Sequence, residues 1–564
     1  MILRIEGNSF RGQILSWLSN LTSLTHLCLA NNNFSGNIPA DLCKLTNLVI
    51  FDVLNNKLDG LVPPSLFNFS SIDVLQLGFN QLAGSLPLDI GFKLPRLRVF
   101  GTLVNNHFGG LIPASLSNAS QLTYLLLRGN QYHGVIPRDI GSHGNLNVFS
   151  VGYNQLQATE PRDWDFLTSL TNCSNLGILD IEQNNFAGFM PISIANLSRE
   201  LIWLTVGRNQ IAGTIPSWIV MSHKLTKLIL ADNLFTGTLP KDIGRLSSLQ
   251  LLDLSQNGFE GQIPQSLGNI TQLSNLYLSS NFLDSSIPAS FRNLTTIGSV
   301  DLSNNILRGE IPQEILTISS LTILLNLSTN ALSGTIPTQI GHLNRLGTID
   351  LSMNKLAGEI PEAIENCVQL SFLYLQGNLL QGQIPKGLNT LGALEKLDLS
   401  SNNLTGHIPK FLESMRTLNY LNLSFNNLSG PVPDTGVFSN ATILSVTGSH
   451  QILLVESTYF SMRGMREYPM PSYMHAATES FSPANLIGSG SSGNVYIGTL
   501  TFDKNLATVA IKVLDLGKQG ANRSFLAECN ALRRIRHQKL VKVITVCSGM
   551  DHNGGEFKAL ALEY

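Results

Sequence analysis

The chain has 564 residues, a formal net charge of −2, 13% charged residues and 43% hydrophobic residues. This balance excludes a strongly basic nucleic-acid-binding protein and a long disordered tail. Its six cysteines are few for an extracellular protein of this length, and because no set of them has metal-ligand spacing, we expect no metal site.

Prolines recur at a near-constant interval through most of the chain. From Pro39 to Pro137, and again from Pro191 to Pro433, the step is 24 to 26 residues. Pro161 continues the series, and about six residues are inserted between it and Pro191. A period of this length indicates a solenoid, in which each coil buries its apolar residues against its neighbours.

An asparagine lies seven residues before each of 17 prolines, from Asn32 to Asn426, and an incomplete frame opens the chain, giving about 18 coils. In the repeat at 251–264, Leu252 and Leu254 alternate with polar residues, which is typical of a short strand with one buried face. We expect each asparagine to hydrogen-bond backbone groups of the turn and of the next coil, because buried main-chain groups need partners.

The residues two, four and six positions before the asparagine should face the concave side of each coil. In late coils these positions repeat Asp and Ser, whereas early and middle coils depart from this pattern. The aromatic and charged residues placed there are Phe100, Tyr124, Arg128, Asp180, Glu182, Trp203 and Lys227, with Tyr153 and Arg208 adjacent. Aromatic residues and Arg are common interface hot spots, so we expect a peptide or protein ligand across these coils. The alternative is that these are ordinary solvated strand residues.

Cysteines and glycosylation sequons give two further expectations for the solenoid. Cys173 and Cys367 occupy the same place in their repeats, where we expect buried free thiols. Cys28 and Cys43 could pair across neighbouring coils, although spacing alone does not decide this. Many N-x-Ser/Thr sequons suit a surface made for the secretory route, although the repeat itself favours Asn-Leu-Ser.

The chain begins in mid-repeat, without a signal-peptide pattern and without a capping repeat. No run of about 18 apolar residues occurs, so we expect no membrane-spanning helix.

After Pro433 the period ends, and residues 434–480 are interpreted as a terminal-coil remnant and a linker. Within the segment 481–564, Gly488, Gly490 and Gly493 form a G-x-G-x-x-G pattern, and Val509-Ala510-Ile511-Lys512 follows. A glycine-rich loop followed by this strand motif predicts a phosphate-binding loop and a phosphate-pairing lysine.

Two side-chain arrangements support this interpretation. On the strand, Ala510 and Lys512 share one face, which leaves room for a flat base beside the lysine. Glu528 lies in the segment Arg523–Arg536, whose apolar residues have helical spacing, and it falls on the inward side. Protein kinases use an ion pair between a strand Lys and a helix Glu that faces the interior.

These motifs resemble a protein kinase amino-terminal lobe, and the whole chain is similar to plant leucine-rich-repeat receptor-like serine/threonine kinases. Three segments look like the subfamily that holds immune receptors for bacterial patterns: Asp163–Leu167, Phe481-Ser482-Pro483 and Arg536-His537. The resemblance implies an α/β solenoid with parallel strands on its concave face, followed by a five-stranded antiparallel sheet with one helix. It also implies a plasma-membrane receptor with a peptide or protein ligand, a co-receptor kinase as partner and no nucleic acid.

The cofactor implied by the resemblance is ATP. Gly488, Gly490 and Gly493 would cover its phosphates, Val495 and Ala510 would line the adenine site, and Lys512 would pair with Glu528. Leu562–Tyr564, with Glu563 at its centre, would begin the hinge.

The sequence departs from the kinase pattern after the hinge. It contains neither H-R-D-x-x-x-x-N nor D-F-G, so we expect no catalytic residues and no phosphotransfer by this polypeptide, with weak or absent ATP binding. The simplest interpretation is a fragment of a receptor kinase, from a truncated gene model or a degraded gene copy. The alternatives are a non-enzymatic interaction protein or decoy receptor with a vestigial lobe, and an intracellular repeat scaffold.

Overall fold

The computed structural model describes residues 1–101, 106–439, 444–445, 482–490, 493–502, 505–514, 543–550 and 556–563. The chain divides into two compact units, Met1–Val455 and Glu456–Tyr564.

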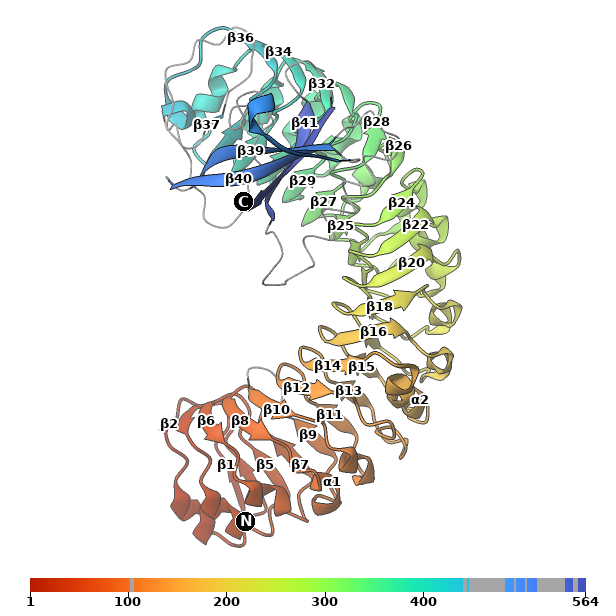
Figure 1. Ribbon diagram of the computed structural model, residues 1–564, viewed down its shortest axis with the longest axis vertical. Helices are drawn as coiled ribbons and strands as arrows, with labels where there is room; N and C mark the ends of the chain where they lie inside the picture. Colours follow the sequence, from red (N-terminus) through yellow and green to blue (C-terminus); the bar gives the residue numbers. More distant parts are fainter. Residues whose placement is uncertain are drawn as a thin grey trace. The chain divides into compact units, whose positions relative to one another are not determined.

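A parallel sheet of 19 strands lines the inner side of the first unit (Figure 1). Each strand contributes two or three residues and pairs in register with the strand of the following coil. The strands are β1 (Ile2–Arg4), β3 (His26–Cys28), β5 (Ile50–Asp52), β7 (Val74–Gln76), β9 (Val99–Gly101), β11 (Tyr124–Leu126), β13 (Val148–Ser150), β15 (Ile178–Asp180), β17 (Trp203–Thr205), β19 (Lys227–Ile229), β21 (Leu251–Asp253), β23 (Asn275–Tyr277), β25 (Ser299–Asp301), β27 (Leu324–Asn326), β29 (Thr348–Asp350), β31 (Phe372–Tyr374), β33 (Lys396–Asp398), β35 (Tyr420–Asn422) and β37 (Leu444–Ser445).

A second set of parallel strands follows the repeated asparagine of each coil and forms sheets of twelve, two and four strands. These strands are β2 (Arg11–Gly12), β4 (Asn33–Gly36), β6 (Lys57–Leu61), β8 (Gln81–Ser85), β10 (His107–Gly110), β12 (Gln131–Gly134), β14 (Gln155–Ala158), β16 (Asn185–Phe189), β18 (Gln210–Gly213), β20 (Leu234–Thr238), β22 (Gly258–Gln262), β24 (Phe282–Asp284), β26 (Arg308–Glu310), β28 (Ala331–Ser333), β30 (Ala357–Glu359), β32 (Leu379–Gly382), β34 (Asn403–His407) and β36 (Asn427–Ser429).

Short helices complete the coils, and the two α-helices lie on the outer side of the solenoid (Figure 1). The α-helices are α1 (Ile90–Lys93) and α2 (Asp165–Leu170). The 3-10 helices of the solenoid are η1 (Ser16–Asn20), η2 (Ala40–Lys44), η3 (Pro64–Asn68), η4 (Ala114–Asn118), η5 (Pro161–Trp164), η6 (Ile192–Asn196), η7 (Ser217–Met221), η8 (Ile243–Arg245), η9 (Gln265–Asn269), η10 (Ala289–Asn293), η11 (Ile315–Thr317), η12 (Thr338–His342), η13 (Glu362–Asn366), η14 (Lys386–Thr390), η15 (Lys410–Ser414) and η16 (Gly436–Ser439).

The asparagine ladder joins the coils through buried hydrogen bonds. Asn257 Nδ2 donates to the carbonyls of Leu254 and Ser255 in its own turn and to that of Leu230 in the preceding coil. Its Oδ1 accepts from the backbone N–H of Phe235, also in the preceding coil. The expected bonds to the turn are therefore confirmed, but the bonds between coils run backward, and the expectation that they reach the next coil was wrong.

The apolar core is one continuous cluster of Leu, Ile, Val and Phe from every coil. Phe100 belongs to it, with none of its surface exposed, so its expected place on the concave face was wrong. Phe100 pairs with Leu75 and Leu125, the buried residues of β7 and β11. This coil carries one extra residue between its strand and Asn106, and counting back from the asparagine therefore shifts the assignment by one position.

The insertion before Pro191 builds the coil that contains α2. Trp164 and Phe166 are buried, and their rings pack against Phe186 with centroid separations of 5.6 and 5.9 Å. A capping box between Glu160 and Asp163 begins η5. The extra residues thus add an aromatic core layer to the solenoid.

The expected free thiols are confirmed, because Cys173 and Cys367 are buried and unpaired. Cys28 and Cys43 are also free, so the disulfide that their spacing allowed is not formed. Among the residues that the structure describes, no helix has the length and apolar character needed to cross a membrane.

The second unit contains a five-stranded antiparallel sheet in the order β38-β39-β40-β42-β41. A 3-10 helix, η17 (Pro483–Asn485), leads into it. The strands are β38 (Leu486–Gly490), β39 (Gly493–Phe502), β40 (Asn505–Leu514), β41 (Val543–Met550) and β42 (Glu556–Glu563). This confirms the expected sheet, whereas the helix expected at Arg523–Arg536, with Glu528, lies outside the described residues.

Candidate functional site

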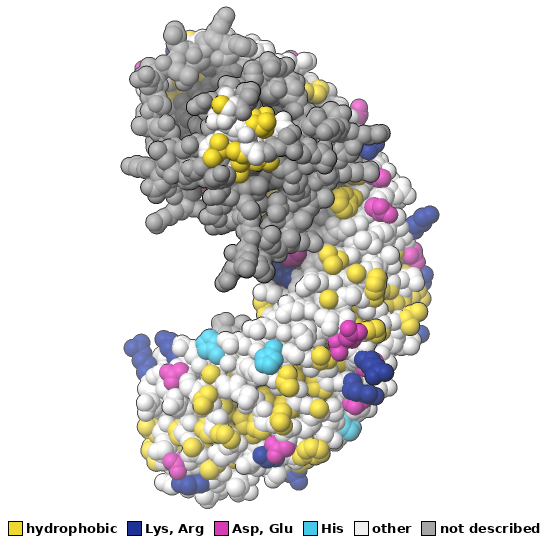
Figure 2. All heavy atoms as spheres, viewed as in Figure 1, with side chains coloured by type: hydrophobic (Ala, Val, Ile, Leu, Met, Phe, Trp, Pro, Cys, Tyr) yellow, Lys and Arg dark blue, Asp and Glu magenta, His cyan; other side chains and the backbone are white. Residues whose placement is uncertain are grey.

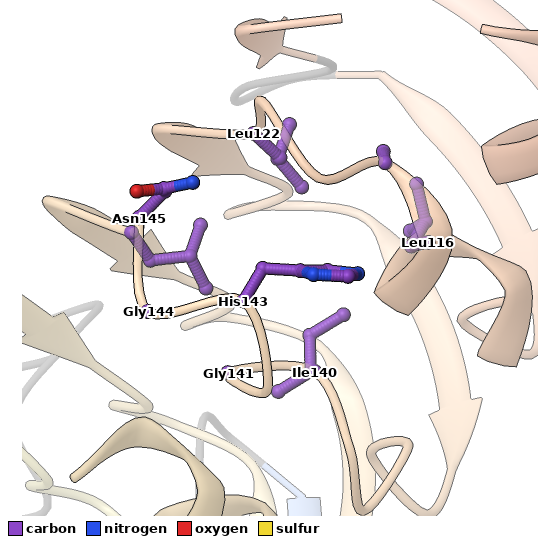
Figure 3. Close-up of a pocket in the computed structure, with 9 residues that line it drawn as sticks. Leu116, Leu122, Ile140, Gly141, His143, Gly144 and Asn145 are labelled. Atoms are coloured by element: carbon purple, nitrogen blue, oxygen red, sulfur yellow. The ribbon is translucent and has the colours of Figure 1, made fainter. Parts of the chain in front are cut away.

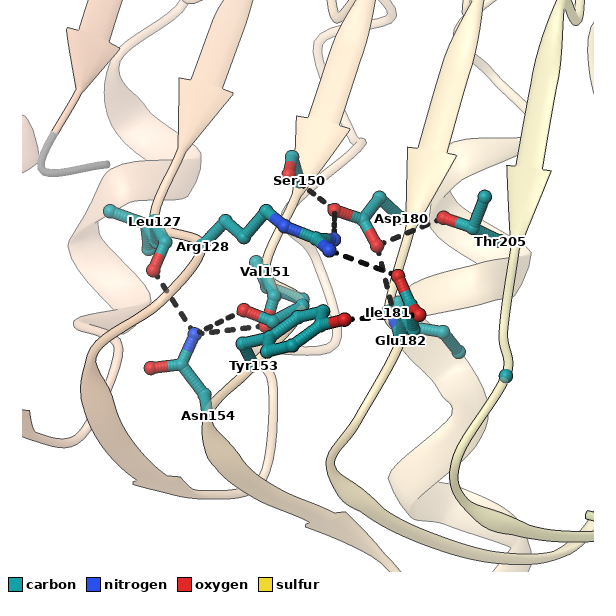
Figure 4. Close-up of polar contacts among 12 residues, drawn as sticks. Leu127, Arg128, Ser150, Val151, Tyr153, Asn154, Asp180, Ile181, Glu182 and Thr205 are labelled. Atoms are coloured by element: carbon teal, nitrogen blue, oxygen red, sulfur yellow. Dashed lines mark hydrogen bonds and ion pairs between the residues drawn. The ribbon is translucent and has the colours of Figure 1, made fainter. Parts of the chain in front are cut away.

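Arg128, which follows β11, bridges to two carboxylates on and after β15. Its Nη1 donates to Asp180 Oδ2 over 2.5 Å, and its Nη2 donates to Glu182 Oε2 over 2.9 Å (Figure 4). The guanidinium lies 4.1 Å from the centroid of the Tyr153 ring, and Tyr153 Oη donates to Glu182 Oε1 over 3.3 Å. The arginine is therefore held by two ion pairs and by a cation–π contact.

A glycine makes this crossing possible. Arg128 and Asp180 lie in coils that are separated by the coil of β13, so the side chain must pass over the strand between them. A Cβ at Gly152 would lie 2.7 Å from Arg128 Nη1 and 2.7 Å from Asp180 Oδ1. Both distances are too short for a real contact, so a side chain at this position would force the ion pair to shift from its observed geometry.

The Asp180 carboxylate is buried and fully partnered. Ser150 Oγ donates to its Oδ2 over 2.7 Å, and Thr205 Oγ1 donates to its Oδ1 over 2.9 Å. Burial alone would lower the pKa of the Arg128 guanidinium, but the charges and hydrogen bonds of Asp180 and Glu182 outweigh burial and raise that pKa.

Arg208 extends the network by one more coil. Its Nη1 donates to Tyr153 Oη over 3.4 Å and to Gln183 Oε1 over 3.0 Å. Five of the residues expected on the ligand surface thus contact one another: Arg128, Tyr153, Asp180, Glu182 and Arg208. Their two positive and two negative charges balance, so the network links the neighbouring coils and offers little net charge to a ligand.

Three further expected residues occupy the first position of their strands: Tyr124, Trp203 and Lys227. Tyr124 and Trp203 are 38% and 43% exposed, which makes them available for contact. Lys227 follows Trp203 in register, and its Nζ lies 5.4 Å from the Trp203 ring centroid. Figure 2 shows charged and hydrophobic side chains scattered over one face of the solenoid. On the concave sheet, the exposed Trp203 ring and the Lys227 cation beside it form a contact surface.

Sequence reasoning missed Gly152, Ser150 and Thr205, which position the Arg128 network. Each is an unremarkable small residue on a strand or turn, and its role depends on what the neighbouring coils place beside it. Strand register is the only signal that could have linked them.

A small cavity lies away from the concave face, between the outer segments of two neighbouring coils (Figure 3). It measures about 10 Å³ and is lined by Leu116, Ile140 and His143, among others. That volume suits about one water molecule, so the cavity is too small for an organic ligand.

The glycine-rich segment of the second unit forms a hairpin in which Gly490 pairs with Gly493. Gly488 pairs with Val495, and Val495 pairs with Lys512 on β40, so these three positions lie side by side across three strands.

Ala510 lies two residues before Lys512 and therefore shares its face, opposite Leu562, whereas Ile511 is fully buried on the other face. Glu563 pairs with Val509 at the end of β42. Glu528 lies outside the described residues, so its expected pairing with Lys512 stays a prediction.

Comparison with protein families supports two kinds of domain. The protein tyrosine and serine/threonine kinase family matches residues 482–555. The leucine-rich repeat family matches seven segments of the solenoid, from 23–45 to 417–436.

The similar curated proteins are plant receptor kinases. The chain is 53% identical over 91 residues to the LRR receptor-like serine/threonine-protein kinase EFR of Arabidopsis thaliana, covering 16% of this chain and 9% of EFR. It is 45% identical over 106 residues to the receptor kinase-like protein Xa21 of rice, covering 18% and 10%. The chain thus spans about a tenth of the length of the curated relatives it matches.

Solved structures match the solenoid over a much longer range. The Arabidopsis receptor kinase HAESA, in complex with the peptide hormone IDA and the co-receptor SERK1, is 34% identical with a TM-score of 0.69, covering 80% of this chain and 74% of HAESA. The plant peptide hormone receptor RGFR1, in complex with RGF2, is 30% identical with a TM-score of 0.68, covering 76% and 72%.

Proposed function

Because the chain belongs to the leucine-rich-repeat receptor-like kinase family, we propose that it is part of a receptor that binds a peptide or protein ligand on the concave face of its solenoid. The observation that carries this proposal is the union of two features in one chain. The solenoid matches receptor ectodomains whose structures hold peptide hormones, and the second unit carries a glycine hairpin beside the Lys512 strand.

The proposed ligand surface centres on Tyr124, Trp203 and Lys227, the exposed or partly buried expected residues that lie outside the Arg128 network. Aromatic side chains supply much of the binding free energy at protein interfaces. The Arg128 network lies beside them and keeps the sheet rigid, so the surface is formed before the ligand arrives, which reduces the entropy cost of binding.

A co-receptor kinase and a plasma-membrane location complete the proposal. The HAESA complex contains the co-receptor SERK1, and the curated relatives are receptor kinases. Sequons along the solenoid suit the extracellular side of a membrane.

The second unit is proposed to hold ATP, and two features of its sheet fit this cofactor. Gly488, Gly490 and Gly493 have no side chains, so a phosphate chain could approach their backbone N–H groups. Val495, Ala510 and Lys512 share one face of the sheet, which offers apolar contact for the base and a cation for the phosphates. ATP would supply the phosphoryl group. Glu528 is the proposed partner of Lys512, and Glu563 is proposed to lie at the start of the hinge.

Phosphotransfer by residues 1–564 alone is not expected. The sequence contains neither the H-R-D-x-x-x-x-N motif nor D-F-G, which supply the catalytic base and the magnesium ligands of protein kinases. Labelled phosphate on any substrate, transferred by the purified polypeptide, would contradict this expectation.

Two binding assays test the proposal. Peptides from plant extracellular fluid are passed over the immobilised chain and, in parallel, over an immobilised Trp203→Asp variant. The bound peptides are identified by mass spectrometry and then synthesised for affinity measurement. A peptide that binds the native chain and loses at least about 10-fold in affinity on the variant supports the ligand surface. A peptide that binds both equally contradicts it.

The nucleotide site is tested with a fluorescent ATP analogue and a Lys512→Met variant. Binding by the native chain that weakens in the variant supports the site. Peptide binding without any nucleotide binding would favour the alternative of a non-enzymatic interaction protein.

A further inference from the structure

A row of apolar side chains runs across seven consecutive strands of the concave sheet. Strand register places each residue beside the next, from Ile50 through Val74, Val99, Tyr124, Val148 and Ile178 to Trp203. Every member is partly buried or exposed, whereas the residue that follows each one on its strand is buried in the core. We call this set the inner apolar row.

The row is confined to one part of the solenoid. His26 precedes it and Lys227 follows it at the same strand position. From β23 onward the position holds polar residues such as Asn275 and Thr348 between isolated apolar ones. Repetition of the coil therefore does not explain the row, because equivalent coils carry polar residues there.

Lys227 carries a positive charge at one end of the row. Its Nζ lies over the Trp203 ring, and none of the ion pairs found in the described part of the chain includes it. Arg98 and Arg128 are paired with Asp73 and Asp180. Arg208, in the same coil as Trp203, is in none of these ion pairs but already donates to Tyr153 Oη and Gln183 Oε1. Lys227 is thus placed to receive a carboxylate from a ligand.

We infer that the inner apolar row binds an extended peptide with apolar side chains along one side and an acidic side chain that meets Lys227. This inference rests on the proposed function and names the class of peptide. Neighbouring strands lie about 4.8 Å apart, so the seven residues span about 29 Å, which an extended peptide rising about 3.3 Å per residue covers with about nine residues.

The shape of the row favours a peptide over a folded partner. The row is one side chain wide. Beside it, the space over Gly101 is filled by the Gln76 side chain, and the space over Gly152 by the side chains of Arg128 and Asp180. A narrow apolar line flanked by polar side chains suits a single extended chain, which buries alternate side chains and keeps the others in water.

Three synthetic peptides of ten residues serve as probes for the full chain. All are acetylated and amidated, so that side chains provide their only carboxylates. The first alternates Val or Leu with Ser and carries Glu at one end, the second replaces this Glu by Gln, and the third replaces every Val and Leu by Ser. Fluorescence polarisation measures the dissociation constants.

We expect the first probe to bind, the second to bind about two- to five-fold more weakly, and the third not to bind. The difference between the first two is that of a solvent-exposed ion pair. Lys227→Gln should weaken the first probe to the level of the second and leave the second unchanged.

Val148→Asp places a charge inside the row and should weaken the first probe by about 10-fold or more, because an unpaired charge would be buried under the peptide. Thr348→Asp is the matched control, since Thr348 occupies the same position on β29 outside the row. Trp203→Ala, at an exposed position, gives a second variant if Val148→Asp unfolds.

Equal binding of the first and third probes would overturn the inference, and so would equal losses from Val148→Asp and Thr348→Asp. If peptide binding persists but ignores every variant in the row, the row is excluded while the proposed peptide recognition stands on another surface.

Discussion

Arg128 crosses an entire coil to reach Asp180, with 2.5 Å between Nη1 and Oδ2. The Asp180 side chain is 8% exposed and the Arg128 side chain 28% exposed, so the pair is largely shielded from water. Removing one partner would leave a carboxylate buried without its counter-charge, which costs far more than the loss of a surface ion pair.

Arg128→Ala is therefore expected to destabilise the coils of β11, β13 and β15 by about 2–3 kcal/mol, because Asp180 and Glu182 lose their cation. Amide hydrogen exchange measures the local opening free energy in these strands. Lys224→Ala is the control, because its ion pair with Glu200 is about half exposed on both sides, and it should cost under about 1 kcal/mol. Equal losses of local opening free energy in the two variants would show that the Arg128 network stabilises its coils no more than a surface ion pair does.

Gly152→Ala should lower the local opening free energy of the same coils without removing any charge. The added Cβ would lie 2.7 Å from both Arg128 Nη1 and Asp180 Oδ1, so the ion pair must lengthen or tilt. We expect a loss of about 1–3 kcal/mol in local opening free energy, comparable to overpacking a core.

Two comparisons make the glycine prediction specific. Gly392→Ala meets no atom within 4 Å and should have little effect. In an Arg128→Ala background, Gly152→Ala should cost less than it does in the native chain, because one of the clashing groups is gone. Additive losses would contradict the steric account.

The coil architecture could be predicted from the sequence because 17 frames agree in register, and each coil repeats the same backbone path. Phe100 shows the limit of this approach. A single inserted residue between strand and asparagine moved it from the expected concave face to the core, since side chains alternate with period two.

The candidate sites were predictable to different degrees. The glycine hairpin and Lys512 follow a local motif, so strand register brings Gly488, Val495 and Lys512 together as the motif suggests. The Arg128–Asp180 pair joins residues 52 apart in non-adjacent coils and depends on Gly152, which no local pattern reveals.

Cys173 and Cys367 should resist alkylation in the folded chain. Burial raises the pKa of the Cys367 thiol to about 12, and its Sγ donates to the Ile340 carbonyl over 3.2 Å. Because the thiolate is the nucleophile, iodoacetamide at a pH of about 8 should modify Cys367 only after unfolding. Cys43 is less buried and should react in the folded state, as peptide mapping by mass spectrometry would show. Fast labelling of Cys367 would contradict this prediction.

Asp350 gives the late concave face a pH-dependent stability. Burial is the main cause that raises the pKa of its carboxyl, and Asp301 and Asp398 raise it further, although Ser352 Oγ and N–H donate to it. A folded pKa above the unfolded one means that the stabilisation is complete below the unfolded pKa, about 3.9, and is lost as pH rises through the folded pKa. Asp350→Asn should therefore stabilise the chain at neutral pH and make no difference in acid.

Asn326 supports this substitution, because it occupies the same strand position and accepts the same two bonds from Ser328. The variant should be made in bacteria, since it creates a glycosylation sequon with Ser352.

Asp163→Asn is the control, because its effect on stability at neutral pH should have the opposite sign. Backbone N–H groups of Glu160 and Thr159 lower the Asp163 pKa, so its loss should destabilise the chain at neutral pH, with the difference vanishing as pH falls through that lowered pKa. Thermal unfolding midpoints of both variants, measured from neutral to acid pH, test these two predictions. A lower midpoint of Asp350→Asn at neutral pH would contradict the role of burial.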